Sequence, residues 1–326
     1  TAAEFVTAFV HDPRADGGGH QAVADRYARI FRAGEIGQFA GIMPVAPVSR
    51  VHTSESHEGT VVKFTQTVPK SPDALDAGTL ETESVLIPMI GKRRVRAYTL
   101  CVSSQVGCAM GCTFCQTAQM GLIRNLRPEE IVQQWFAARW LVQRPDPEAE
   151  IRNIVFMGMG EPMDNFESVM QAIRVLTDHR GPAIAPSRVT ISTVGRVDGI
   201  ARLAEVVSQP GWHRLCLAIS LNAPSDEVRG SIMPINRKYN LAALRGSLEQ
   251  WPTYGTSHLC IEYVLIPGVN DAVHHADQLA PGRQVDDGAG ELLDVAHARH
   301  VFHQAHQIGE AADLAEVGIG LELGLE

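Results

Sequence analysis

The stretch AYTLCVSSQVGCAMGCTFC, residues 97–115, decides the fold. Its first part, 97–104, has the β-branched and aromatic residues typical of a strand, and the rest is a loop rich in cysteine. Six cysteines in 326 residues are too few for a disulfide scaffold. Four of them fall within fifteen residues, which indicates a metal or redox site in a reducing compartment: Cys101, Cys108, Cys112 and Cys115.

Beyond this stretch, short β-rich runs alternate with longer helical patterns as far as residue 280. This rhythm is typical of repeated βα units over a parallel sheet. The expected strands are 97–104, 151–158, 188–193, 214–221 and 259–266. The expected helices are 128–143, 166–178, 199–208, 240–251 and 272–280. Five such units predict an α/β fold with a partial, open TIM-type barrel.

The two ends of the chain differ from this core, so the sequence predicts three regions. Residues 1–96 form an N-terminal α+β extension, with helical patterns at about 1–10 and 20–33. The extension ends in two strand-like runs that can pair antiparallel, TVVKFTQTV (60–68) and LETESVLIP (80–88). Residues 97–280 form the barrel core, and residues 281–326 form an atypical acidic tail.

The net charge of −9 at first argues against a partner as acidic as nucleic acid. The tail 281–326 holds two Arg, no Lys and nine acids, which leaves 26 basic and 28 acidic residues in the rest of the chain. The acidic balance therefore belongs mostly to the tail and does not exclude an RNA substrate. No apolar run is long enough to span a membrane, and we expect a cytoplasmic protein without a membrane partner, acting as a monomer.

The cysteine loop has the spacing C-x3-C-x2-C. Three thiolates on one short loop can bind an iron–sulfur cube and leave one iron without a protein ligand, whereas electron-transfer clusters usually take four thiolates. An open iron can bind a substrate or cofactor, as the open position of a catalytic zinc site does. The alternative is a structural zinc site that uses these three cysteines with Cys101 or a histidine, although zinc sites usually place a longer insert between cysteine pairs.

Several motifs together resemble the RlmN/Cfr family of radical S-adenosylmethionine (SAM) RNA methyltransferases. They are CVSSQVGCAMGCTFCQTAQMGLIRNL (101–126), GMGEP (158–162), ISTVG (191–195), SLNAPSDEVR (220–229) and MPINRKYN (233–240). The resemblance covers about residues 75–280. It implies an open radical-SAM barrel whose cofactor performs the difficult step by releasing a 5′-deoxyadenosyl radical from SAM.

The resemblance also implies the site residues. A [4Fe–4S] cluster would be bound by Cys108, Cys112 and Cys115, and SAM would bind at the open iron. The implied SAM contacts lie where predicted strands end: Gly160, Glu161, Ser192, Ser220, Leu221 and Asn222. The family usually has histidine where this chain has Asn222, and an amide can still donate and accept hydrogen bonds.

Two further residues match catalytic positions of the family. Cys101 matches the cysteine that resolves a covalent RNA adduct, and otherwise reads as a buried strand thiol. Glu83 matches the glutamate that accepts a proton during addition to adenine, and otherwise reads as an exposed strand-edge charge. The family's methyl-carrying cysteine has no match, because Cys216 and Cys260 both fall inside predicted strands.

The family relationship implies methylation of C2 of adenosine in 23S ribosomal RNA, in some members also transfer RNA, with electrons from a flavodoxin-type donor. An unpaired loop is the expected target, because a base must leave its stack to react. The expected RNA contacts are Lys92, Arg93, Arg94, Arg124 and Arg127, and the alternative for them is a solvated turn and helix start. Two other functions stay open: an iron–sulfur protein that cleaves SAM without methylating RNA, and a non-enzymatic RNA-binding relative.

Overall fold

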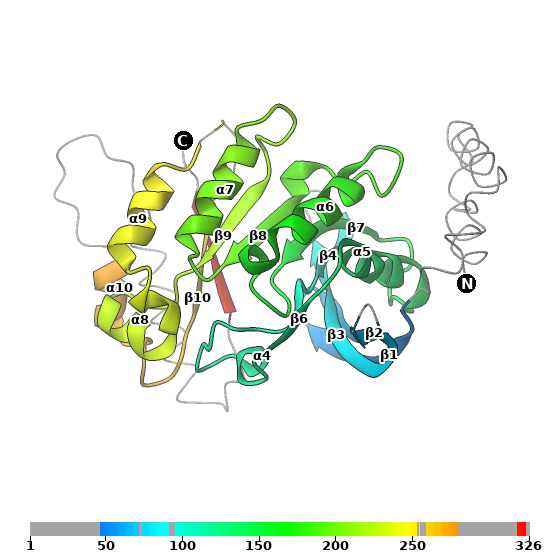
Figure 1. Cartoon of the computed structure of the whole chain (residues 1–326), viewed down its shortest axis with the longest axis horizontal. Helices are drawn as coiled ribbons and strands as arrows, with labels where there is room; N and C mark the ends of the chain where they lie inside the picture. Colours follow the sequence, from blue (N-terminus) through cyan, green and yellow to red (C-terminus); the bar gives the residue numbers. More distant parts are fainter. Residues whose placement is uncertain are drawn as a thin grey trace.

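The computed structural model describes residues 46–71, 74–90, 95–252, 254, 259–279 and 318–323. Its centre is a run of five parallel strands, at the places where the sequence predicts them (Figure 1). In sheet order these are β4 (Arg96–Cys101), β7 (Glu150–Phe156), β8 (Val189–Thr193), β9 (Cys216–Ser220) and β10 (Leu259–Val264). The carboxyl ends of all five therefore meet at one edge of the sheet.

Three antiparallel strands extend the same sheet beyond β4: β1 (Val48–Ser56), β2 (Gly59–Ser71) and β3 (Ala74–Ile90). The predicted pairing of 60–68 with 80–88 is confirmed, since Val62 lies opposite Leu86 and Val68 opposite Leu80. The sequence analysis did not predict β1, because its side chains are mostly exposed and show no alternation. The helical patterns expected at 1–10 and 20–33 lie outside the described residues.

At the other edge, β11 (Gly318–Leu323) pairs antiparallel with β10. The sheet thus runs in the order β1-β2-β3-β4-β7-β8-β9-β10-β11, and within the described part of the chain its two edge strands do not pair with each other. A separate two-stranded ladder joins β5 (Gln105–Gly107) to β6 (Leu122–Asn125). An open arrangement of this kind agrees with the partial barrel that the sequence predicts.

The five predicted helices are all present. They are α5 (Pro128–Phe136), α6 (Phe166–Thr177), α7 (Val197–Val207), α9 (Leu241–Glu249) and α10 (Val273–Leu279). The first is shorter than expected, since the chain continues from Ala137 to Leu141 as a π-helical turn. Two short helices were not predicted, α4 (Gln116–Gln119) and α8 (Asp226–Ile232). Three 3₁₀ turns were not predicted either: η2 (Pro162–Asn165), η3 (Pro186–Arg188) and η4 (Pro234–Arg237). None of the described helices is long and apolar enough to cross a bilayer.

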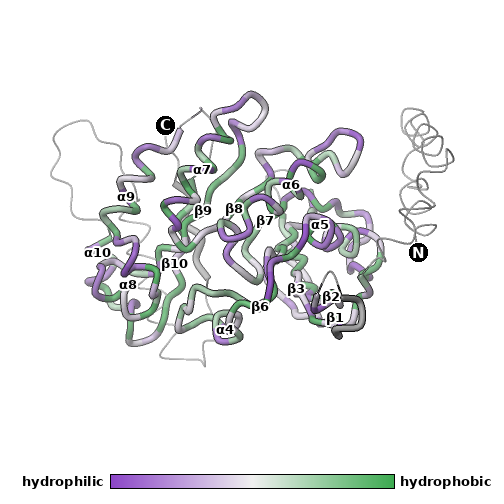
Figure 2. Tube along the Cα trace, viewed as in Figure 1, coloured by the Kyte–Doolittle hydropathy of each residue, from purple (hydrophilic) through white to green (hydrophobic). Residues whose placement is uncertain are grey.

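The hydrophobic core lies between the helices and one face of the sheet. Leu86, Leu100 and Ile154 follow one another across three strands, and all are fully buried. They pack in one cluster with side chains of the helices, including Ile131, Ile173 and Leu203. Figure 2 shows the hydrophobic residues along strands and helices and the hydrophilic ones at the connecting turns. Because strand side chains alternate, the other face of the sheet, here called the inner face, carries the remaining strand residues.

Candidate functional site

The inner face carries polar and nucleophilic side chains on neighbouring strands. Strand pairing sets Cys101 of β4 beside Val85 of β3 and Val155 of β7. Farther along the parallel strands, Ser192 lies beside Ala218, and Ser220 beside Glu262. The implied resolving thiol and two implied SAM contacts therefore share this face.

Ser192, Ser220 and Glu262 form a hydrogen-bonded group near the carboxyl edge of the sheet. The Ser192 and Ser220 hydroxyls donate to Oε2 of Glu262 at 2.5 and 2.9 Å, and their Oγ atoms lie 3.5 Å apart. Sequence reasoning placed the two serines but missed Glu262. The strand sequence LCIEYV could have indicated Glu262. Its buried apolar residues occupy every second position, so Glu262, which lies between two of them, is directed away from the core.

Cys101 and Glu83 lie on the same face, as their expected roles require. Glu83 precedes Val85, the pairing partner of Cys101, by two residues. Burial raises the pKa of Cys101 to about 12, and the charges of Glu262 and Glu83 add to this shift. The Glu83 carboxylate is partly exposed and forms a 2.8 Å ion pair with Nζ of Lys63. Glu83 thus supplies a negative charge close to a thiol that stays protonated at neutral pH.

The cysteine loop is closed at its base by the β5–β6 ladder. Gly107 is required there, since its φ is +76° and an added Cβ would come 1.8 Å from the Gly121 carbonyl oxygen. The amide of Cys108 donates to that oxygen at 3.1 Å, and the amide of Thr113 donates to the carbonyl of Ile232 at 2.9 Å. The loop is thus fastened both to its own base and to the end of α8.

The three loop thiols fit the iron–sulfur group that their spacing implies. Cys108 and Cys112 are buried and Cys115 is half-buried, so little water reaches them. Burial raises the pKa values of Cys108 and Cys112 to about 11 and about 12, and the nearby Cys115 thiol raises both further. Apolar side chains such as Met233 and Phe114 surround Cys112. A site of this kind favours a cationic group that relieves the repulsion between thiolates.

No three His, Cys, Asp or Glu side chains among the described residues converge closely enough to hold a single metal ion.

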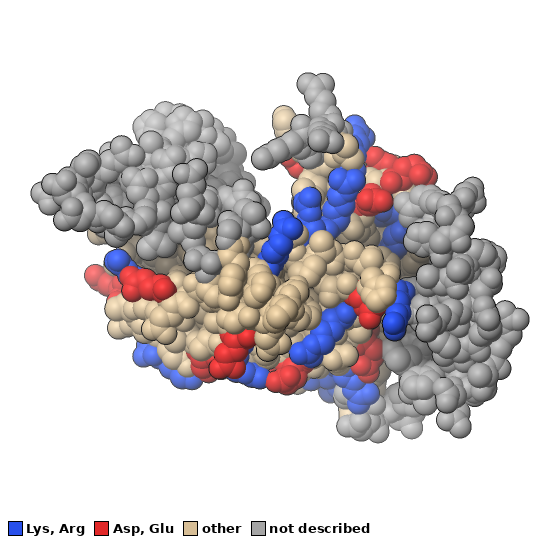
Figure 3. Space-filling model, turned by 90° about the horizontal axis from the view of Figure 1, so that it is seen from above, with Lys and Arg blue, Asp and Glu red and all other residues tan. Residues whose placement is uncertain are grey.

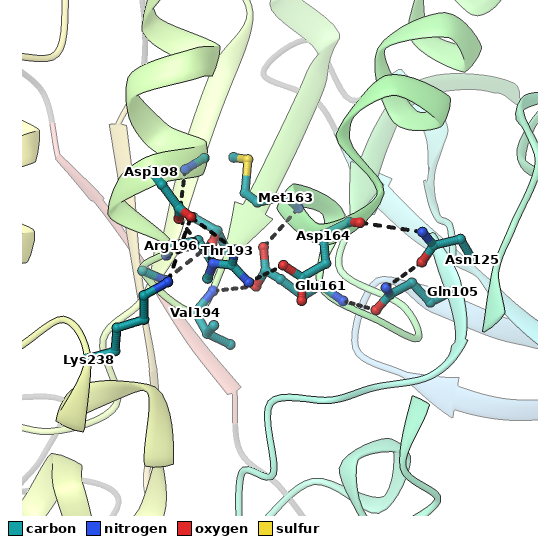
Figure 4. A network of polar contacts seen from close by, with 12 residues as sticks. Gln105, Asn125, Glu161, Met163, Asp164, Thr193, Val194, Arg196, Asp198 and Lys238 are labelled. Carbon is teal, nitrogen blue, oxygen red and sulfur yellow. Dashed lines mark hydrogen bonds and ion pairs between the residues drawn. The ribbon is translucent and has the colours of Figure 1, made fainter. Parts of the chain in front are cut away.

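Glu161 is the most perturbed carboxyl group of the site (Figure 4). Burial raises its pKa to about 7, although the backbone amides of Val194 and Met163 donate to its two oxygens at 2.9 and 3.0 Å. Gly160 before it has a φ of +102°, and a Cβ there would lie 2.5 Å from Cβ of Gln105. Gly160 therefore lets Gln105 pack directly against the backbone that leads into Glu161.

A chain of polar contacts fixes Glu161 relative to the ladder below it (Figure 4). The Glu161 amide donates to Oε1 of Gln105 at 2.8 Å, and Nε2 of Gln105 donates to Asn125 at 2.7 Å. On the other side, Arg196 bridges Asp164 and Asp198, and this guanidinium lowers the pKa of Asp198 to about 2. Polar side chains so firmly paired favour a preorganised site over a mobile one.

Leu221 and Asn222 follow β9 at the same edge. The Leu221 amide donates to the carbonyl of Glu262 at 3.0 Å. Asn222 has a φ of +56°, a left-handed conformation that asparagine adopts more readily than most residues. Its buried side chain accepts a 2.9 Å hydrogen bond from the amide of Val264, and it thereby ties the end of β9 to the end of β10.

Arg229 is a second buried group that the sequence analysis missed, although it ends the SLNAPSDEVR motif. It lies in α8, is fully buried and donates to carbonyl oxygens at the ends of β8 and β9. Only the motif itself could have pointed to it, since an arginine in a short polar helix is usually exposed.

The expected RNA contacts have mixed outcomes. Lys92, Arg93 and Arg94 lie outside the described residues. Arg124 forms a buried, two-pronged ion pair with Glu130 at 2.7 and 2.8 Å, which accounts for it without RNA. Arg127 begins α5 with a partly exposed side chain. On the face drawn in Figure 3, Lys and Arg lie among Asp and Glu, so the described residues of this face form no single-sign patch.

An open parallel sheet, a three-thiol loop after its first strand and a buried glutamate at the next strand end together define a class. A family model described as the radical SAM superfamily matches residues 102–279, and the chain belongs to that superfamily. A crystal structure of a radical SAM methyltransferase from Sphaerobacter thermophilus superposes with a TM-score of 0.61 at 31% identity, covering 83% of this chain and 77% of that one.

Relatives in sequence show which family of the radical SAM superfamily the chain resembles. The chain is 47% identical over 201 residues to the probable dual-specificity RNA methyltransferase RlmN 1 of Protochlamydia amoebophila, covering 61% of this chain and 52% of that protein. It is 41% identical over 245 residues to the dual-specificity RNA methyltransferase RlmN of Campylobacter jejuni, covering 72% and 64%. It therefore spans between about half and two thirds of the length of these curated relatives. Within the superfamily, the chain is a member of the RlmN-like family.

Proposed function

We propose that the chain is a radical SAM RNA methyltransferase that methylates C2 of an adenosine in 23S ribosomal RNA, with transfer RNA as a further substrate. One observation carries the proposal. The inner face of the sheet brings together Cys101 of β4, Glu83 of β3 and the Ser192–Ser220–Glu262 group of β8, β9 and β10. Strands β4 and β7 of the same sheet lead to the cysteine loop and to Glu161. The choice of C2 over C8 follows the more frequent chemistry of the family.

In this function, Cys108, Cys112 and Cys115 would hold a [4Fe–4S] cluster and leave one iron open for SAM. When bound, that group supplies the electron that breaks the SAM sulfonium bond and releases the 5′-deoxyadenosyl radical. The Glu161 carboxylate would accept hydrogen bonds from the SAM ammonium, and Gly160 lets Gln105 come close enough to hold the Glu161 amide. The Ser192 and Ser220 hydroxyls donate to Glu262, which leaves their oxygens able to accept hydrogen bonds from ribose hydroxyls.

The RNA chemistry would fall to Cys101 and Glu83. Glu83 would accept the proton released when the adenine ring is restored after addition of the methyl carbon, and Lys63 at 2.8 Å would help to hold its carboxylate in place. In the family, the resolving cysteine forms a disulfide with the methyl-carrying cysteine and releases the methylated base, so Cys101 would need that second thiol, a position that no cysteine of this sequence matches. Because its pKa is raised, the Cys101 thiol is protonated at neutral pH and must lose that proton before it can attack. The nearby negative charge of Glu83 contributes to the raised pKa.

A second candidate is SAM cleavage without RNA methylation. The observation that favours it is the place of the two remaining cysteines, since Cys216 and Cys260 lie within β9 and β10. A thiol fixed in a sheet strand is poorly suited to carry a methyl group between two bound substrates. A reductant of the flavodoxin type and a cytoplasmic location are parts of both candidates.

Anaerobic reconstitution followed by product analysis separates these functions. We expect about four irons per chain, 5′-deoxyadenosine on addition of SAM and reductant, and 2-methyladenosine in unmodified ribosomal RNA measured by mass spectrometry. Cys112→Ala should lose the cluster, while Cys216→Ala, a matched loss of a buried thiol outside the loop, should keep it. SAM cleavage without methylated RNA would support the second candidate, and a wild-type chain that binds no iron would refute both.

A further inference from the structure

Arg229 occupies an unusual position between the strand ends and the cysteine loop. Its side chain is fully buried, and each nitrogen of the guanidinium donates a hydrogen bond. Nη2 donates to the carbonyl of Val194 at 2.6 Å, Nε to the carbonyl of Leu221 at 3.0 Å, and Nη1 to Oδ1 of Asn236 at 3.0 Å. One side chain thus ties the ends of β8 and β9 to the turn after α8.

The positive charge of Arg229 is not balanced by a carboxylate contact. All its hydrogen bonds within the described structure go to carbonyl or amide oxygens. A buried cation costs several kcal/mol unless it is compensated, and proteins almost always pair one with an anion. The closely packed carbonyl dipoles offset part of this cost. The remainder points to an anionic group that approaches Arg229 in the working protein.

The nearest candidate for that anion is the cysteine loop. The Thr113 amide donates to the carbonyl of Ile232, the last residue of α8, and Cys112 packs in one apolar cluster with Ile232 and Met233. Burial lowers the pKa of the Arg229 guanidinium, and negative charge on Cys112 or Asp226 opposes that shift. The loop that would carry the thiolates therefore lies against the helix that carries the buried cation.

We propose that Arg229 is a positioning residue that acts as the buried counter-charge of the cluster site and raises the cluster's reduction potential. The proposal rests on the proposed function, because it needs an iron–sulfur group bound at the loop. In the step concerned, one electron passes from a low-potential one-electron donor to the cluster, no bond forms or breaks, and the site becomes more negative by one charge. Arg229 stabilises that added charge in a dry environment, where net charge is a main control of such potentials.

The test is the midpoint potential of the reconstituted full chain, measured by a mediated titration followed by electron paramagnetic resonance, without SAM or RNA. At the wild-type midpoint potential, we expect Arg229→Gln to lower the ratio of reduced to oxidised cluster at least tenfold. For a one-electron couple, a tenfold change lowers the midpoint potential by about 59 mV. Arg229→Lys, which keeps the charge, should stay within about threefold of wild type. A purely structural role would not separate these two variants.

Two further variants keep the test decisive if Arg229→Gln does not fold. Asn236→Asp places a negative charge on the atom that accepts from Nη1, beside Asp226, and should lower the potential in the same direction. Arg144→Gln is the matched control, because Arg144 is also buried and donates to backbone carbonyls but precedes β7, at the amino ends of the parallel strands and away from the cysteine loop at their carboxyl ends. It should leave the potential unchanged.

The outcomes distinguish this inference from the proposed function. A wild-type chain without a cluster would overturn the proposed function and the role of Arg229 together. A cluster whose potential is the same in wild type, Arg229→Gln and Asn236→Asp would overturn only the role of Arg229. A tenfold shift in Arg229→Gln that Arg144→Gln does not share would support it.

Discussion

If Glu161 binds the SAM ammonium as proposed, SAM binding should depend on pH near neutrality. Burial raises the pKa of its carboxyl group to about 7, so the neutral acid prevails below that value. Only the carboxylate can accept from an ammonium, so affinity should fall as the pH falls. We expect the Kd for SAM to rise about fivefold from pH 7 to pH 6, where the amino group of the ligand stays protonated. Equilibrium dialysis at both pH values measures this.

Glu161→Gln provides the control for this pH dependence. Its amide cannot become charged, so this variant should bind SAM weakly at both pH values with little dependence on pH. The neighbouring Asp164, whose pKa burial also raises, is unchanged in the variant and would retain its own contribution. An equally steep profile in Glu161→Gln would assign the effect to Asp164 or to the loop thiols.

Gly160 tests how tightly the site is built. Gly160→Ala combines a φ of +102° with a Cβ placed 2.5 Å from Gln105, whose side chain holds the Glu161 amide. Gly211→Ala is a matched control, because its φ is +90° and an added Cβ meets nothing within 4 Å. We expect the control to lose about 1 kcal/mol of stability and Gly160→Ala about 2–4 kcal/mol. Thermal melts of both variants decide, and equal losses would show that Gln105 yields easily.

At the scale of elements, Gln134 fastens α5 to the strand ends. It is fully buried, its Oε1 accepts from the Ser103 amide and the Ser84 hydroxyl at 2.8 Å, and its Nε2 donates to the Ser103 carbonyl at 2.8 Å. Gln134→Leu leaves both backbone groups of Ser103 without these partners and should cost about 2–4 kcal/mol in denaturant unfolding. Ser84→Ala removes only one of the donors to Oε1 and should cost about 1 kcal/mol or less. Similar losses in both would contradict this account.

The elements also show what the sequence could and could not predict. All five parallel strands were predicted within about three residues at each end, because a run such as LCIEYV shows both β-branched content and alternation. Helix α8 was missed because its seven residues are too few to show a helical period. The start of the helix is marked by Ser225, whose hydroxyl accepts a hydrogen bond from the Val228 amide. The SAM contacts were implied by the family resemblance and stay a prediction. Glu262 and Arg229 were missed because their partners are distant in sequence, joined only by the fold.

For the whole molecule, the question is whether the N-terminal strands form a unit of their own. The division at residues 96 and 280 remains a prediction. Strand β3 pairs with β4 along the whole length of β4, and the sheet passes from antiparallel to parallel strands without a break (Figure 1). One core cluster contains Phe64 and Leu86 of this part together with Leu217 and Ile261 of the far strands. A shared core favours a single cooperative unit over two.

Two substitutions at opposite ends of the sheet test this cooperativity. Leu86→Ala and Ile261→Ala each remove a buried side chain from the shared core, and each should cost about 2–4 kcal/mol. If the described strands unfold as one unit, either change should speed amide hydrogen exchange in both β2 and β9, measured by peptide-level mass spectrometry. Leu86→Ala would instead affect only β1–β3 if these strands opened alone. That outcome would establish a domain boundary near residue 96. Faster exchange in both β2 and β9 would place β1–β3 in the same folding unit as the five parallel strands.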